Sequence, residues 1–403
     1  MTNFIASLAR WLPLVVQAFT AFLALCGLAY YCAAGLAARK YLRERRKLIA
    51  AQDAATFAPA VSLLKPLRGV DAGMYAALAS HCAQDYPGEY ELIFGAGPED
   101  SAARQAVEQL QREFPERKIS FIACPELLGP NGKVSTLAQM LPHARHDFLL
   151  INDSDIFATP DYLRRVMQEF APAQVGMVTA LYSGHCVADA RGHIPLWSKL
   201  EALTVSTEFV PGCLLAMRID GQVKFALGGT LAIRREVLAK IGGFEALVDV
   251  LADDYEMGVR TIAAGYSVAM APVTVQTAVP PYSLQNFTAH QLRWLRTVRD
   301  SRGLGYAGLP LTFGLVWAFA AMIASAGALW SWPLLSLMLL ARLALALSVG
   351  VGVLGDTQVL RDWWLIPLRD VMGAWLWAWS YASDEVEWRG IKFKLHDGKL
   401  TRL

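Results

Sequence analysis

The chain carries no charged side chain from Leu12 to Ala38, and this run limits its possible folds more than any other feature. At 1.5 Å per residue, a helix of this length exceeds the roughly 20 residues that cross the hydrocarbon of a bilayer. A cleavable signal peptide is the alternative, but its apolar region is only about 7 to 15 residues long. We therefore expect residues 1–48 to form a membrane-spanning helix with a basic flank.

The basic residues around this run predict its orientation. A lone Arg10 precedes the run, whereas six cations follow it: Arg39, Lys40, Arg43, Arg45, Arg46 and Lys47. The positive-inside rule places the segment after the helix in the cytoplasm. The same cations can also contact anionic lipid headgroups.

Composition limits the class of protein further. A hydrophobic fraction of 55% with only 18% charged residues is too apolar for a wholly soluble chain of 403 residues, so apolar segments should be segregated. A net charge of +2 argues against nucleic acid as a partner. The six cysteines show no CxxC spacing, which favours structural thiols over a zinc site or disulfides.

Residues 57–300 alternate short apolar runs with amphipathic stretches, which is typical of an α/β domain with a largely parallel sheet. Ligands in such folds collect beyond the carboxyl ends of the strands, where Asp71, Asp100 and Asp153 are expected. The expected strands are 61–64, 90–94, 119–123 and 148–151, and the expected helices are 72–84, 101–113 and 133–141.

Residues 301–403 are expected to hold further membrane helices and a basic tail. The stretches 311–329 and 332–355 are apolar enough to span a bilayer. A third stretch, 363–381, is rich in tryptophan and contains Arg369 and Asp370. A third crossing would place the basic tail outside, so we expect this segment to be interfacial or re-entrant.

Asp153 and Asp155 follow a strand of buried composition, in the sequence Asn152-Asp153-Ser154-Asp155. Two carboxylates one residue apart can reach one Mg²⁺ or Mn²⁺ ion, and a nucleotide diphosphate can complete the oxygen ligands. The alternative is an Asx turn that caps the helix beginning near Pro160.

Asp253 and Asp254 precede a predicted helix that ends at Gly265. Acids at a helix amino terminus are stabilised by the helix dipole, which accounts well for one of the two. Sugar transfer to an alcohol needs a base within hydrogen-bond reach of the hydroxyl, and Asp254 is our candidate.

The segment 290–299 is predicted to be a strongly basic helix. It is either a cationic helix that faces lipid headgroups or a catalytic element. In the catalytic interpretation, Arg293 stabilises the charge of a departing diphosphate and Trp294 forms a wall beside the sugar or acceptor.

Lys133 opens a predicted helix after the turn Gly129-Pro130-Asn131-Gly132. Its ammonium and the backbone N–H groups of the turn can hold a phosphate. The segment lacks the GK[ST] ending of a P-loop, so an ATPase is excluded.

In this order, the motifs resemble the processive-type GT-A glycosyltransferases of family 2 and, most closely, the ceramide glucosyltransferases of family 21. The segment from Lys65 to Asp71 resembles the KPLxGVD opening of that group, and Asp153 with Asp155 matches its DxD. Asp254 falls at the position of its presumed base. His290 to Trp294 matches the final motif, except that His290 replaces the expected Gln or Arg.

A still closer resemblance is to the bacterial hopanoid glycosyltransferases, which share the phrases 225–228, 251–255 and 290–294. A looser likeness extends to Trp388-Arg389-Gly390. The resemblance implies a Rossmann-like GT-A domain in the cytosol, on the inner face of a bacterial inner membrane. It implies a UDP-sugar donor near Lys65, Asp71, Asp100, Lys133 and His290, and Mg²⁺ or Mn²⁺ as cofactor.

The expected function is transfer of glucose or N-acetylglucosamine to a lipid alcohol, with a hopanoid as the first candidate acceptor and ceramide as the second. A processive polysaccharide synthase would share the donor site but needs more spans for a secretion channel. A non-catalytic scaffold would fold without any transfer of the sugar.

Overall fold

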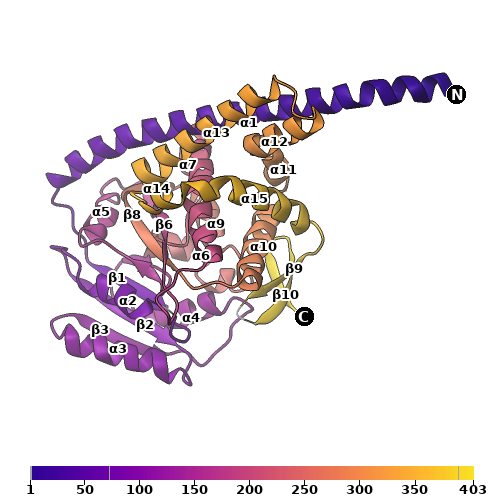
Figure 1. Cartoon of the computed structure of the whole chain (residues 1–403). Coiled ribbons are helices and arrows are strands. Elements are labelled where there is room, and N and C mark those ends of the chain that lie inside the picture. Colours follow the sequence, from indigo (N-terminus) through magenta and orange to yellow (C-terminus); the bar gives the residue numbers. More distant parts are fainter. Residues whose placement is uncertain (1, 72, 389) are drawn as a thin grey trace.

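A computed structural model describes residues 2–71, 73–388 and 390–403, and its centre is an eight-stranded mixed sheet (Figure 1). The strand order is β3-β2-β1-β4-β7-β6-β8-β5. The strands are β1 (Val61–Pro66), β2 (Tyr90–Ala96), β3 (Lys118–Ala123), β4 (Phe148–Ile151), β5 (Ile156–Phe157), β6 (Val175–Cys186), β7 (Leu231–Arg234) and β8 (Ser267–Val279).

The first half of the sheet is parallel, as the sequence predicts. Strand β1 pairs in parallel with β2 and β4, and β2 pairs in parallel with β3. Strand β7 then runs antiparallel to both β4 and β6, while β6 and β8 are parallel. All of β2 is buried, which explains why it is apolar except for Glu91. The expected α/β architecture is therefore confirmed, with a mixed second half.

Helices cover the two faces of the sheet. The predicted helix 101–113 is α3 (Ser101–Glu113), which Asp100 caps by accepting a hydrogen bond from the Ala103 N–H. Ala72, at the start of another predicted helix, lies outside the described residues. Other helices of this domain are α2 (Met74–Cys82), α4 (Gly132–Met140), α5 (Tyr162–Gln168), α8 (Arg235–Lys240), α9 (Asp253–Ala263) and α10 (Leu284–Ser301).

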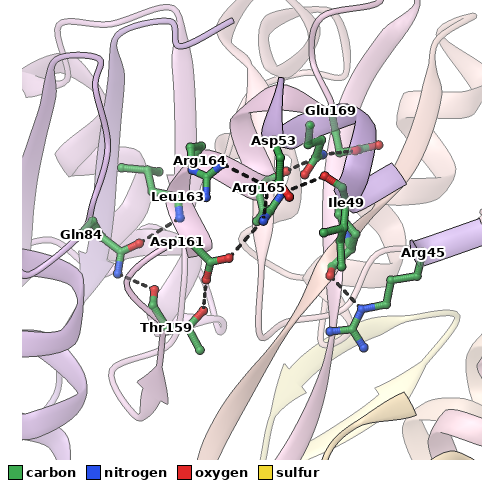
Figure 2. Close-up of polar contacts among 12 residues, drawn as sticks. Arg45, Ile49, Asp53, Gln84, Thr159, Asp161, Leu163, Arg164, Arg165 and Glu169 are labelled. Carbon is green, nitrogen blue, oxygen red and sulfur yellow. Dashed lines mark hydrogen bonds and ion pairs between the residues drawn. The ribbon is translucent and has the colours of Figure 1, made fainter. Parts of the chain in front are cut away.

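The expected membrane helix is α1 (Thr2–Asp53), whose amino-terminal half projects beyond the rest of the chain (Figure 1). Its carboxyl end is fixed to the sheet domain (Figure 2). Arg165 of α5 forms an ion pair with Asp53 at 2.7 Å, and Gln52 donates to Glu169 at 2.5 Å. Arg45 donates to the carbonyls of Pro272 and Val353, so this cation stabilises the fold.

The carboxyl-terminal apolar region differs in part from the prediction. The stretch 332–355 forms one apolar helix, Ser331–Val353, composed of α13 (Ser331–Ala346) and the π-helical η5 (Leu347–Val353). The stretch 311–329 was wrongly predicted as a span. Its helix α12 (Gly314–Ala324) has 11 residues and rises about 16 Å, roughly half of the hydrocarbon thickness. A turn at residues 325–330 ends this helix and reverses the chain.

The tryptophan-rich stretch forms α14 (Gln358–Asp362), η6 (Trp363–Leu365) and α15 (Ile366–Ser380). With 15 residues, α15 is too short to cross a bilayer upright. Its Arg369 and Asp370 point into the protein, where Asp370 pairs with Arg342 of α13 at 2.8 Å.

One long helix was not predicted from the sequence. Residues 196–220 form α6 (Leu196–Thr204), the π-helical η2 (Val205–Phe209) and α7 (Val210–Asp220). The segment is long and apolar enough to cross a membrane, but 61% of its apolar stretch is buried inside the protein. Its apolar side chains therefore serve the internal core, and α7 contacts α1.

Large apolar side chains are exposed mainly on the layer formed by α1, α12, α13 and α15. Within this layer, the backbones of α1 and α12 approach closely at Gly27 and Gly314, where a methyl group on Gly27 would clash with Gly314. An apolar exposed layer of this kind indicates membrane association. Its exposed members include Phe19, Phe22, Leu25, Trp332, Leu340 and Trp375.

The basic tail folds as a three-stranded antiparallel sheet with β9 (Glu385–Trp388), β10 (Ile391–His396) and β11 (Lys399–Arg402). Arg389 of the tail likeness lies outside the described residues. The sheet packs against the segment that precedes α9: Leu400 donates to the Asp249 carbonyl at 2.7 Å, and Leu251 donates to the Gly398 carbonyl at 3.1 Å. The tail thus supports the segment that leads to Asp254.

Candidate active site

The carboxyl end of β4 fixes the positions of Asp153 and Asp155. The buried Asn152 donates hydrogen bonds to the Tyr162 hydroxyl and to the Gly229 carbonyl, which holds the turn after the strand. Asp155 accepts a hydrogen bond from the Thr277 hydroxyl of β8 at 2.7 Å. The Asp153 side chain is 43% exposed, whereas that of Asp253 is only 9% exposed.

The second acidic pair lies at the amino terminus of α9. Lys133, at the start of α4, joins this pair to β4: its ammonium lies 2.9 Å from Asp153 Oδ1 and 3.2 Å from Asp253 Oδ2. Burial alone would lower the pKa of Lys133, but the charges of Asp153, Asp253 and Asp254 outweigh it, and the pKa is raised. Lys133 therefore remains a cation among these carboxylates.

Gly228 marks the place where the two acidic motifs meet. A methyl group on Gly228 would lie 3.3 Å from Asp254 Oδ2 and 3.6 Å from Asp153 Oδ2. Both oxygens are therefore within van der Waals reach of the same small group. Residues separated by about a hundred positions in the sequence thus face one shared space.

The carboxyl groups of Asp155 and Asp254 have raised pKa values. Burial, aided by the charge of Asp253, raises the pKa of Asp254 to about 6, while Lys133 opposes the rise. Burial and the charge of Asp153 raise the pKa of Asp155 to about 6. Both groups are still mostly ionised at neutral pH, but they are stronger bases than an exposed aspartate.

Lys65 is fully buried beneath the turn that carries Asp153. Its ammonium lies 3.1 Å from His81 Nε2 and donates to the Asp153 carbonyl at 3.4 Å. Burial lowers the pKa of Lys65 to about 7, against the opposing charges of Asp153 and Asp155. This placement supports the backbone of Asp153 from below and leaves the Lys65 side chain without exposed surface.

Asp71 and Asp100 lie beyond the ends of β1 and β2, as expected. Asp71 is exposed in the loop that precedes α2. The Asp100 carboxylate accepts hydrogen bonds from the Gly69 and Ala103 N–H groups, so it ties this loop to the start of α3. Asp100 thereby shapes the loop that presents Asp71.

Helix α10 brings the last motif to the same region. His290 pairs with Glu201 of α6 at 3.1 Å, and its ring lies 5.1 Å from that of Trp294. Trp294 in turn contacts Phe209 at 6.0 Å, and Phe209 contacts Tyr182 at 5.7 Å between ring centroids. An aromatic row therefore runs from α10 to β6.

Both ends of this row lie close to the acids. Tyr182 packs beside Gly229, the neighbour of Gly228. At the other end, the Tyr282 ring lies 5.5 Å from His290. Burial raises the pKa of the Tyr282 phenol, the charges of Glu201, Asp155 and Asp71 act in the same direction, and Arg293 opposes them. The charges that act on this phenol thus come from α6, from α10 and from the loops after β1 and β4.

The structure also identifies site residues that the sequence did not indicate. Glu201 binds both His290 and Gln291, the latter at 2.8 Å. Tyr182 lies within the field of the Asp254 and Asp153 charges. A glutamate in a largely apolar segment was the available signal for Glu201, whereas nothing in the local sequence marks Tyr182.

The site fits a divalent cation only together with a substrate. Among the residues that the structure describes, no group of three or more His, Cys, Asp and Glu side chains could hold a metal ion. Burial and, after it, the charge of Asp153 nevertheless raise the pKa of Asp155, so the two carboxylates repel each other. A cation shared between two carboxylates relieves such repulsion, and Mg²⁺ commonly takes its remaining ligands from substrate phosphates and water.

A parallel half-sheet extended by antiparallel strands, with acids beyond β1 and β4 and at the start of α9, is the arrangement of a GT-A type glycosyltransferase. Residues 8–401 match the family model described as Glycosyl transferase family 21, and the chain belongs to that family. This result confirms the expected family.

Named relatives agree with this family. Over 272 residues the chain is 24% identical to ceramide glucosyltransferase 1 of Caenorhabditis elegans. The matched segment covers 64% of this chain and 56% of the relative. Over 235 residues it is 25% identical to an N-acetylglucosaminyltransferase of Mesorhizobium japonicum, and this match covers 56% of this chain and 52% of the relative. The chain thus spans about half the length of these relatives.

Among solved structures, the chain is similar to a mannosyltransferase from Pyrobaculum calidifontis in complex with GDP-Man and Mn²⁺. The identity is 19%, the TM-score is 0.45, and the match covers 89% of this chain and 99% of the other.

Proposed function

We propose that this chain is a membrane-bound inverting glycosyltransferase that moves a sugar from a UDP-sugar to a hydroxyl of a membrane lipid. The observation that carries the proposal is the shared space at Gly228, which Asp254 and Asp153 face together. A base and a site for the leaving diphosphate must be this close for direct displacement at the anomeric carbon.

The donor diphosphate binds above β4 in this proposal. Asp153 and Asp155 would hold Mg²⁺ or Mn²⁺, which offsets the negative charge of the leaving UDP. Asp71 and the loop held by Asp100 lie at the carboxyl end of β1, where the uridine binds. Lys65 supports the site by fixing the Asp153 backbone from below.

Asp254 acts as the general base. Its pKa of about 6 leaves it ionised at neutral pH and makes it a better proton acceptor than an exposed aspartate. It removes the proton of the acceptor hydroxyl as the oxygen attacks the anomeric carbon from the face opposite UDP. An α-linked donor therefore gives a β-linked product.

Helix α10 assists at the leaving group. Arg293 stabilises the charge that builds on the departing diphosphate, and Lys133 adds a second cation beside Asp153. Trp294 forms a wall of the sugar or acceptor site. His290 is held by Glu201 and orients the Trp294 ring through their contact.

The acceptor is a lipid alcohol that approaches from the membrane layer. Burial of a lipid chain is worth about 0.8 kcal/mol per methylene, so the apolar helices concentrate the acceptor beside the site. In this proposal the catalytic domain lies on the cytosolic face of a bacterial inner membrane, with α1 and Ser331–Val353 as spans. The cluster of cations after Ala38 supports this orientation.

The proposal is tested by mass spectrometry of lipids from cells that express the chain, with differently labelled UDP-glucose and UDP-N-acetylglucosamine in competition. We expect one labelled sugar on a hopanoid such as bacteriohopanetetrol, and ceramide is the second candidate. A soluble polymer made from the UDP-sugar alone would identify a polysaccharide synthase. Absence of any labelled product together with intact UDP-sugar would contradict the proposal.

A further inference from the structure

Tyr182, in the second half of β6, has a hydroxyl that packing does not explain. The residue is only 9% exposed, and its hydroxyl makes no hydrogen bond with any residue that the structure describes. A phenylalanine would fill the same space without burying a polar group. Because buried hydroxyls in folded proteins almost always have a partner, this one points to an atom of a ligand.

The turn that contains Gly228 holds the Tyr182 ring beside the acids. Leu227 of this turn donates to the Thr179 hydroxyl of β6 at 2.9 Å, which fixes the turn against the strand. A methyl group on Gly229 would lie 3.4 Å from Tyr182 Cδ1, so the ring packs directly on the turn. The preceding Gly228 is the residue that both acidic motifs approach. The ring and the two carboxylates therefore lie against adjacent residues of one turn.

Phe209 also restrains the Tyr182 ring. The Phe209 ring centroid is 5.7 Å from that of Tyr182, and the Trp294 ring centroid is 6.0 Å from that of Phe209. Trp294 is the proposed wall of the sugar or acceptor site. Contacts with Phe209 and with the glycine turn restrict rotation of the Tyr182 ring, so they also set the direction of its hydroxyl.

The electrostatic environment of Tyr182 links it to Asp254. Burial raises the pKa of the Tyr182 phenol well above its usual value, and the largest charge effect in the same direction comes from Asp254. Asp153 has a smaller effect of the same sign. The phenol therefore keeps its proton at neutral pH, where Asp254 is mostly ionised. It can donate a hydrogen bond, but it cannot act as a base.

A hydroxyl group is the ligand that suits Tyr182 and Asp254 together. Asp254 Oδ1 accepts the hydrogen bond from the Tyr255 N–H, whereas Oδ2 faces Gly228 in the shared space. There the carboxylate oxygen can accept a hydrogen bond and the phenol can donate one. A hydroxyl is a donor and an acceptor at once, so it can bridge the two groups, whereas an ionised phosphate offers only acceptors.

We infer that Tyr182 is a further acceptor-binding residue, whose hydroxyl donates a hydrogen bond to the alcohol oxygen that Asp254 deprotonates. The inference rests on the proposed function and adds a residue to it. The alcohol proton passes to Asp254 as an oxygen lone pair forms the bond to the anomeric carbon, and the bond to UDP breaks with its electron pair leaving on UDP. The Tyr182 phenol keeps its proton throughout and holds the oxygen so that a lone pair points at the anomeric carbon.

The test uses the full-length chain in lipid nanodiscs with Mg²⁺, UDP-glucose or UDP-N-acetylglucosamine, and bacteriohopanetetrol or ceramide as the acceptor. The variant is Tyr182→Phe, which removes only the hydroxyl. The matched control is Tyr266→Phe: Tyr266 packs against Gly176 at the start of β6, and its hydroxyl accepts a hydrogen bond from Lys240. The measured quantities are kcat/KM for the acceptor, KM for the UDP-sugar, and the unfolding temperature without substrates.

Tyr182→Phe should lower kcat/KM for the acceptor about fivefold to tenfold, the effect of losing one hydrogen bond. The factor should be the same between about pH 6 and 8, because the phenol does not ionise in this range. KM for the UDP-sugar should not change. The unfolding temperature should stay the same or rise, since the hydroxyl has no partner among the described residues before the acceptor binds. Tyr266→Phe should change none of the kinetic constants.

Three results would overturn the inference: an unchanged kcat/KM for the acceptor, a matching rise in KM for the UDP-sugar, or a lower unfolding temperature, as expected on loss of an internal hydrogen bond. In each case the wild type still glycosylates lipids, so the proposed function stands. If the wild type glycosylates neither lipid from either UDP-sugar, the proposed function itself fails, and this inference fails with it.

Discussion

Replacement of Asp254 by Asn should abolish transfer and at the same time stabilise the fold. The amide keeps the size of the side chain, and its oxygen can still accept the hydrogen bond from the Tyr255 N–H, which is 2.8 Å long. It cannot remove a proton from the acceptor. We expect turnover to fall by about 10² to 10⁴, the usual contribution of a general base, with UDP affinity nearly unchanged.

The stabilisation follows from the pKa of Asp254. Burial raises this pKa from 3.8 to about 6, so the ionised carboxylate is unfavourable in the folded protein. At about 1.36 kcal/mol per pKa unit, the unfavourable free energy is roughly 3 kcal/mol at most. Because the folded pKa lies above the unfolded one, this penalty is absent below about pH 4, grows as the pH rises to 6, and is constant above.

The assay is thermal unfolding of wild type and Asp254→Asn in metal-free buffer between pH 4 and 8, alongside lipid transfer with Mg²⁺. The variant should unfold at a higher temperature at pH 7.5 and at nearly the same temperature as wild type at pH 4. The matched control is Asp253→Asn, which should lower stability because it deprives the Lys133 ammonium of one of its two close carboxylates.

The opposite result has a clear meaning. If Asp254 served only to stabilise the amino terminus of α9, its neutralisation would destabilise the protein by about 0.3 to 1 kcal/mol. A lower unfolding temperature for Asp254→Asn at pH 7.5, or near-normal transfer, would therefore refute the assignment of Asp254 as a buried base.

Three further changes test other parts of the site. Asp155→Asn should weaken Mg²⁺-dependent UDP binding about tenfold or more, measured by calorimetry, while metal-free binding stays unchanged. Gly228→Ala places a methyl group 3.3 Å from an Asp254 oxygen and should lower turnover, whereas Gly97→Ala meets open space and should not. Leu400→Asp inserts a charge into the buried core of the tail sheet; it should reduce turnover while membrane association persists, and unchanged turnover would show that the tail does not support the segment before α9.

Much of the architecture follows from local patterns in the sequence. The uncharged run predicts α1, and the short apolar runs predict β1 to β4, with β4 at the expected residues 148–151. The helix 101–113 is also as expected, since Asp100 provides a local cap. These features depend on periodicity, composition and capping over a few residues, so the sequence alone determines them.

The errors in the apolar regions share one physical cause. Hydropathy gives the length of an apolar run, but it cannot tell whether lipid or protein covers it. The stretch 311–329 is broken by a turn after Ala324, and the apolar helix 196–220 is covered largely by the protein itself. In both cases the neighbouring helices decide the outcome.

The sequence by itself determined the order of the acidic motifs and the presence of an apolar anchor. Only the tertiary structure placed Asp153 and Asp254 against the same glycine and Lys133 between two carboxylates. Contacts between residues so far apart in the chain depend on how the sheet and helices pack. Packing is a property of the whole fold, so no local pattern of residues encodes it.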